Sequence, residues 1–230
     1  MGTFLAAAGG DQRLARELYV WDRDLAAAML ADIAIVEVAL RNAMHDALAA
    51  VWGPLWFADP AVRLDERSAG QLASAWKSLP SNHRGDRSDP QLPGRLVARC
   101  MLGFWVNLLD AGDHVGAHPR RMRVDYERLW RQALHRAFRG GRAEARARGD
   151  RYTRDWAHAI AKNVNTLRNR AAHHEPLVNG FPLPGQNRRL TAEQGHAEVM
   201  TLARMLDRDL ATWINQDTAV HRLLATRPAP

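Results

Sequence analysis

The sequence is poor in both cysteine and lysine. Cys100 is its single cysteine, which excludes an internal disulfide and a zinc site built from several cysteines. Lysine occurs only at Lys77 and Lys162, so the positive charge comes almost entirely from arginine. Arginine suits bidentate contact with phosphate, but a compositional bias of the source genome, which the high alanine content also suggests, would give the same excess. Composition alone therefore does not separate a phosphate-binding surface from a solvated one.

The sequence also lacks a long uncharged apolar stretch. Its most apolar segment, 25–40, is interrupted by Asp32 and Glu37, which is typical of a buried helix and not of a membrane span. The first residues have no basic start followed by an apolar run, so we expect no signal peptide. We therefore expect a cytoplasmic protein without membrane contact. The net charge of +7 favours an anionic partner.

The remaining pattern is helical, and no alternating strand of any length is present. We predict helices over about 22–51, 65–78, 94–109, 125–138, 150–174 and 192–215, with a short tail helix from 217. The segments 80–94 and 139–149 are predicted to be a loop and a charged connector. We expect a single all-α domain over 1–230, a helical bundle with long crossover loops and a core over about 15–215.

One segment, TLRNRAAHHEPLVNG at 166–180, concentrates groups that can act on a phosphate. On the predicted helix, Arg168 lies about 40° from the centre of an apolar stripe, where a guanidinium is costly unless it is bonded. Asn169 and His173 are four residues apart and share a face. Arg168 and His173 lie about 140° apart. They can meet if Pro176 breaks the helix beside the histidines, or if a second copy of the chain supplies one of them.

These residue types suit the cleavage of RNA. A neutral histidine can take the proton of a 2′-hydroxyl, and a guanidinium can hold the phosphate and stabilise the charge of the pentacovalent state. Asn169 can orient either group. No metal or other cofactor is needed, and a cyclic phosphate end results. The spacing from arginine to histidine decides little by itself, because Arg128 to His135 and Arg151 to His158 are similar.

The longer pattern is more specific. The string LRNRAAHH (167–174) resembles the Arg-Asn-x-x-Ala-His-His signature of the Abi-like (abortive infection) family, within the HEPN superfamily. The string IVEVALRNAM (35–44) is similar to that family's early helix with Glu-x-x-x-Arg. LVARCMLGFWVNLL (96–109) is similar to its central helix, and LHRAF (134–138) to a further short motif. The four motifs follow the family's order over about residues 15–215.

The resemblance implies a HEPN-like helical bundle and a metal-independent ribonuclease, with a site that is often composed across a homodimer. It also implies a role in phage defence or as a toxin, with an antitoxin or a regulatory RNA as a further partner. Arg168, Asn169 and His173 match the signature as catalytic residues, and His174 is its second histidine. Glu175 departs from the family, which commonly has a basic residue there. Its charge either opposes a phosphate or orients a histidine.

Glu37 and Arg41 are supporting candidates on the early helix. Glu37 lies about 40° from the apolar stripe of that helix. Glu37 and Arg41 are four residues apart, so they can form an ion pair within the helix. The alternative is that Glu37 holds Arg168 or Arg41 in the site.

Other candidate sites are weaker. His114 and His118 are spaced like metal ligands, but they lie in a predicted loop without a third strong ligand, so we expect no metal. Cys100 lies in an apolar run and is expected to be a core residue and not a nucleophile. The alternative function is a non-catalytic HEPN-like module that binds RNA or a partner protein. DNA binding ranks lower, because no helix-turn-helix is evident.

Overall fold

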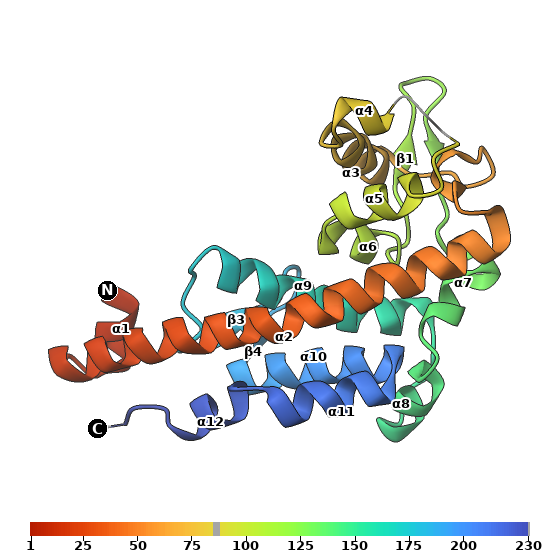
Figure 1. The fold of residues 1–230 in the computed structure, drawn as a ribbon. Helices are drawn as coiled ribbons and strands as arrows, with labels where there is room; N and C mark the ends of the chain where they lie inside the picture. Colours follow the sequence, from red (N-terminus) through yellow and green to blue (C-terminus); the bar gives the residue numbers. More distant parts are fainter. Residues whose placement is uncertain (85–87, 230) are drawn as a thin grey trace. The chain divides into compact units, whose positions relative to one another are not determined.

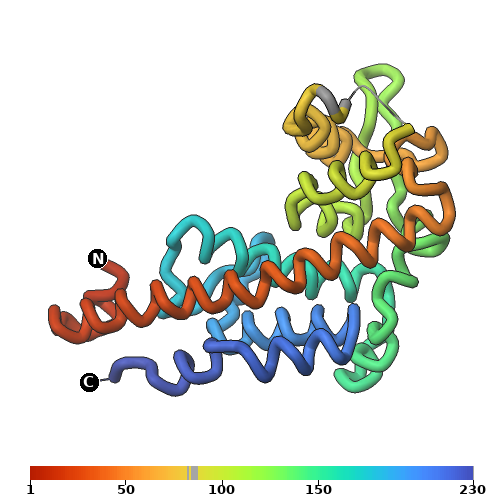
Figure 2. Tube along the Cα trace, in the orientation of Figure 1, coloured from red at the N-terminus to blue at the C-terminus, as the bar shows by residue number. Residues whose placement is uncertain are grey.

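The computed structural model describes residues 1–84 and 88–229. These residues are mostly helical, with two short two-stranded hairpins, so the predicted all-α class is confirmed. Figures 1 and 2 follow the elements along the chain. Residue contacts divide the chain into two compact units. We call Met1–Val36 with Ile160–Pro230 the terminal unit, and Glu37–Ala159 the central unit.

The longest element, α2, runs without a break from Gln12 to Trp52 (Figure 2). It begins earlier than the predicted residue 22, because the carboxylate of Asp11 accepts the backbone N–H groups of Arg13 and Leu14 at 2.8 and 3.2 Å, as an N-cap does. It ends at Trp52, close to the predicted residue 51, and Gly53 follows with a φ of 80°. Apolar side chains at helical spacing along α2 are buried, at Leu14, Leu18, Trp21, Leu25, Met29, Ile33, Val36, Leu40, Met44 and Leu48.

The terminal unit combines parts of α2 and of α9 (Arg154–Ala172) with the two ends of the chain. Its other elements are α1 (Gly2–Ala7), β3 (Phe181–Pro182), β4 (Arg189–Leu190), α10 (Ala192–Leu206), α11 (Arg208–Asp217) and α12 (Val220–Ala225). A capping box of Thr191 and Gln194 starts α10. The helix predicted over 192–215 is two helices, because the carboxylate of Asp207 caps α11. Figure 1 shows α10 and α11 side by side.

The central unit contains several short helices and one hairpin. Its elements are the 3-10 turn Trp56–Ala58, α3 (Glu66–Lys77), α4 (Ser81–Arg84), α5 (Leu92–Arg99), α6 (Leu102–Asn107), β1 (His114–Val115), β2 (Met122–Arg123), α7 (Glu127–Gln132), the 3-10 turn Leu134–Ala137 and α8 (Gly141–Ala147). In the hairpin, His114 pairs with Arg123 and Val115 with Met122. Figure 1 shows α3 close to α5 and α6.

Several predicted boundaries in the central unit are wrong. The helix predicted over 94–109 is interrupted by extended backbone at Cys100 and Met101. The segment 139–149, predicted as a connector, contains α8, because Ala145 is buried and Gly141 packs so tightly on Tyr152 that an added Cβ would lie 2.4 Å from its ring. The loop predicted over 80–94 contains α4 and the start of α5. Within it, 85–87 lie outside the described residues.

The apolar stripe predicted on α9 forms part of the core. All its members are at most 3% exposed, at Ala157, Ile160, Ala161, Val164, Leu167 and Ala171. Within the described part of the chain, no helix has both the length and the apolar character that crossing a bilayer requires.

Candidate functional site

The candidate catalytic residues lie at the C-terminal end of α9. The backbone N–H of His173 still donates to the carbonyl oxygen of Asn169 at 2.9 Å, so the helical bonding continues to His173. The next residue, His174, has a φ of 56°, which is the left-handed conformation that ends many helices. The helix therefore ends beside the histidines, as Pro176 predicted, and the turn follows His173.

The position of this turn decides how Arg168 and His173 are arranged. Because α9 is regular from Arg168 to His173, the two side chains leave the helix about 140° apart. The turn at His174 comes too late to rotate His173 toward Arg168. The regular end of α9 therefore does not bring Arg168 and His173 onto one face of the helix.

Arg168 is half-buried, and its guanidinium has one described hydrogen bond, which is long. Its Nη1 lies 3.4 Å from Oδ1 of Asn169, which is long for a hydrogen bond. Among the described residues, no carboxylate forms an ion pair with Arg168. Asn169, His173 and His174 are exposed. The end of α9 therefore presents one cation without an anionic partner, together with two accessible imidazoles.

Glu175 does not lie free beside the histidines. One of its carboxylate oxygens is 2.8 Å from Nη1 of Arg170, and the Glu175 backbone N–H donates to the Arg170 carbonyl oxygen at 2.9 Å. The second contact, with φ positive at His174, completes a Schellman turn. Arg170 also donates to the carbonyl oxygen of Pro176 at 3.4 Å. The carboxylate of Glu175, where the sequence departs from the family signature, is therefore paired with Arg170 of α9.

The chain that follows this turn is fixed to α2 by Asp22. The Asp22 carboxylate is buried and accepts the backbone N–H of Leu177 at 2.9 Å. Burial raises the pKa of Asp22, and this effect is opposed by backbone hydrogen bonds from Leu177 and Val178 and by the charges of Arg170 and Arg227. A carboxylate thus lies beside the turn that ends α9, held by donors of its own.

Glu37 has a contact that the sequence did not indicate. Its Oε1 accepts the backbone N–H of Leu102 at 2.9 Å, at the first residue of α6. Among the described ion pairs, none joins Glu37 to Arg41. Arg41 has a buried Nε without a hydrogen-bond partner in the described part of the chain. The observed role of Glu37 is to cap α6, and its role beside Arg168 stays a prediction.

Cys100 is a core residue, as predicted. Its side chain is 5% exposed, and burial raises the pKa of the thiol to about 12, against a smaller lowering by the charge of Arg41. The thiolate is the nucleophilic form of cysteine. Cys100 is therefore protonated near neutral pH and does not act as a nucleophile.

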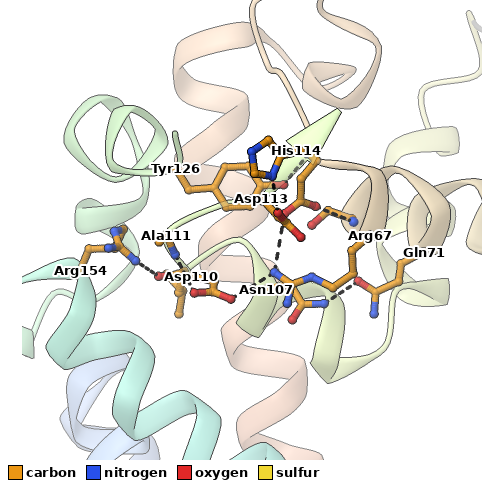
Figure 3. Close-up of polar contacts among 12 residues, drawn as sticks. Arg67, Gln71, Asn107, Asp110, Ala111, Asp113, His114, Tyr126 and Arg154 are labelled. Atoms are coloured by element: carbon orange, nitrogen blue, oxygen red, sulfur yellow. Dashed lines mark hydrogen bonds and ion pairs between the residues drawn. The ribbon is translucent and has the colours of Figure 1, made fainter. Parts of the chain in front are cut away.

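A polar cluster in the central unit was not predicted (Figure 3). The fully buried carboxylate of Asp65 accepts the backbone N–H groups of Ser68 at 2.8 Å and of Asp113 at 3.1 Å. Arg67 bridges two acidic groups, with Nη2 3.6 Å from Asp65 and 3.2 Å from Asp110. These contacts cap α3 and fix the segment that leads into the hairpin, so their role is structural.

His114 also belongs to this cluster. Its Nδ1 lies 2.8 Å from Oδ1 of Asp113 (Figure 3), and this hydrogen bond lowers the pKa of Asp113. The described residues contain no group of three or more histidine, cysteine or acidic side chains that could hold a metal ion. His114 and His118 belong to no such group within residues 1–84 and 88–229.

Arg154, at the start of α9, is a second feature that sequence reasoning missed. It is buried, and it donates to the carbonyl oxygen of Leu109 at 2.7 Å, to Glu127 at 3.0 Å and to Asp155 at 2.5 Å. Its partners satisfy the buried charge, as a buried guanidinium requires. Arg154 therefore anchors the first turn of α9 within the central unit.

In comparisons with known proteins, no family model, no curated protein and no solved structure matches the chain. A functional assignment therefore depends on the residues of the chain itself.

Proposed function

We propose that the chain is a metal-independent endoribonuclease with a HEPN-like all-α fold, acting in the cytoplasm. Arg168, Asn169 and His173 are its catalytic residues. The observation that carries the proposal is the half-buried guanidinium of Arg168, whose one described hydrogen bond is a 3.4 Å contact to Asn169. A phosphodiester supplies the anion that this guanidinium lacks, and an exposed histidine lies on the next turn.

The chemistry follows from the side chains that are present. His173, as a neutral imidazole, takes the proton of the 2′-hydroxyl. The 2′ oxygen attacks phosphorus, the bond from phosphorus to the 5′ oxygen breaks, and a protonated histidine returns a proton to the departing oxygen. The products are a 2′,3′-cyclic phosphate and a 5′-hydroxyl. Arg168 stabilises the charge on the pentacovalent phosphorus, and Asn169 orients His173. His174 is the second histidine available for the proton return.

We further propose that the site is composed across a homodimer. Arg168 and His173 leave α9 about 140° apart, while both are accessible from solvent. A two-fold axis places the same surface of each copy against the other. An Arg168 from one copy can then face a His173 from the other, and the shared cleft gains the positive charge of both chains.

The resemblance of LRNRAAHH to the family signature supports, as part of this proposal, a role in phage defence or in a toxin–antitoxin pair. An enzyme that cuts cellular RNA needs restraint, and we propose an antitoxin or a regulatory RNA as the further partner. Glu37 and Arg41 remain supporting candidates within this proposal.

A second candidate is a non-catalytic HEPN-like module that binds RNA or a partner protein. The exposure of Asn169 and His173 favours it, because exposed polar side chains at a helix end also suit a binding surface. The two candidates differ in whether RNA is cut.

The test is RNA cleavage in EDTA by the wild type, Arg168→Ala and His173→Ala. Arg16→Ala and His118→Ala are matched controls, because both residues are exposed and lie outside the proposed site. We expect the wild type and the controls to leave cyclic phosphate ends, and the two site variants to be slower by about 100-fold or more. Equal cleavage by all five proteins would remove the assignment. Loss of wild-type cleavage in EDTA would indicate a metal-dependent reaction.

A further inference from the structure

A small pocket in the terminal unit opens beside the second histidine. Its walls come from α1, α2 and the end of α9, and His174 and Glu175 lie on its lining. Its cavity volume is about 200 Å³. Apart from His174, the proposed chemistry uses no residue of this lining, so the pocket is available for a further part of the substrate.

The size of the pocket limits what it can hold. Three alanines, Ala26, Ala27 and Ala171, leave the space open between the helices. A volume of about 200 Å³ corresponds to roughly seven water molecules at ~30 Å³ each. It is smaller than the ~300–1,000 Å³ of pockets for drug-sized ligands. The pocket therefore suits one planar ring system.

One wall is an exposed aromatic ring. Tyr19 is 51% exposed and also lines the pocket. The buried ring of Phe4 meets it edge to face, with centroids 5.3 Å apart and planes at 82°. This contact holds the tyrosine ring in place, which lowers the entropic cost of stacking a flat ligand on it.

The charges of the lining select the kind of ring. The carboxylates of Asp22 and Glu175 both line the pocket, and Arg23 lies beside them. Two carboxylates disfavour a phosphate inside the pocket, but they accept hydrogen bonds from the exocyclic amino group of adenine, cytosine or guanine. Uracil has no such group.

The pocket is also next to the proposed phosphate site. Arg168 lies three residues before Ala171, which lines the pocket, so the two residues share a face of α9. A nucleotide whose base enters the pocket can therefore reach Arg168 with its phosphate.

We infer that this pocket binds one unpaired base of single-stranded RNA, stacked on Tyr19, with a preference for bases that carry an amino group. The inference rests on the proposed function, because it takes the ligand to be part of the RNA that is cut. It assigns that RNA to the single-stranded class, since a base within a duplex cannot enter.

The experiment measures binding without cleavage. The probes are fluorescein-labelled 2′-O-methyl octanucleotides of adenine, cytosine or uracil, which lack the 2′-hydroxyl nucleophile, and affinity is measured by fluorescence anisotropy. The variants are Tyr19→Ala, Tyr19→Phe, which keeps the ring, and Ala27→Leu, which fills the pocket. Trp213→Ala is the control, because Trp213 is a 53% exposed aromatic of the same unit outside the pocket.

We expect Tyr19→Ala and Ala27→Leu to weaken binding of the adenine probe by about tenfold, while Tyr19→Phe and Trp213→Ala bind like the wild type. The uracil probe should bind the wild type more weakly than the other two. Equal affinity of the wild type and Tyr19→Ala for all probes would overturn the inference, even if the enzyme cuts RNA. The expected binding pattern without cleavage of unmodified RNA would support the pocket and remove the ribonuclease proposal.

Discussion

The backbone N–H of His173 donates to the carbonyl oxygen of Asn169 at 2.9 Å, which keeps both residues on one face of α9. Arg168 lies on a different face, about 140° from His173. The left-handed turn begins only at His174. Because the helix keeps Arg168 and His173 on different faces, we propose that each site takes these two residues from two chains.

The contact between Glu37 and Leu102 predicts that Glu37 contributes to stability. Loss of a helix N-cap costs about 1 kcal/mol, so Glu37→Ala should lower the free energy of unfolding by about that amount. Glu37→Gln should cost less, because its amide oxygen can still accept the N–H. Urea denaturation measures both values. Unchanged stability together with lost RNA cleavage in Glu37→Ala would instead place Glu37 in the catalytic site.

The raised pKa of Asp22 predicts a dependence of stability on pH. A carboxyl group whose pKa is raised by folding favours the folded state most below its ordinary value of 3.8, and this contribution is lost as pH rises through the raised pKa. Asp22→Asn removes the titration. Its free energy of unfolding relative to the wild type should therefore increase as pH rises from about 4 through the raised pKa of Asp22, by about 1.4 kcal/mol for each pH unit by which the pKa is raised.

Denaturant unfolding of both proteins over this pH range measures the trend for Asp22. The matched control is Asp24→Asn, since Asp24 is more exposed and pairs with Arg23 at the surface. A flat or falling difference for Asp22→Asn would contradict the effect of burial on its pKa.

The buried stripes of α2 and α9 were predictable from the sequence, because helical spacing of apolar residues follows directly from 3.6 residues per turn. The capping box of α10 was also predictable, since Thr191 and Gln194 are local to each other. The break before α6 was not. Its cap is Glu37, which is 65 residues away from Leu102 in sequence, and no local pattern reports such a contact.

The candidate site shows the same limit. The sequence placed Arg168 at the margin of an apolar face and a helix end beside the histidines. It did not show on which side of His173 the helix ends, because the left-handed position is His174 and not the glycine that usually marks such a turn. The pocket beside His174 depends on three-dimensional packing with α2, which spacing along one helix does not encode.

The most direct test of the central claim is complementation between two inactive variants. Arg168→Ala and His173→Ala are coexpressed with different tags, and the mixed dimers are tested for RNA cleavage in EDTA. If each site takes Arg168 from one chain and His173 from the other, one of the two sites in a mixed dimer is intact, and the mixed dimers should recover about half of wild-type activity. Wild-type cleavage without any recovery in the mixture would contradict a site composed of two chains.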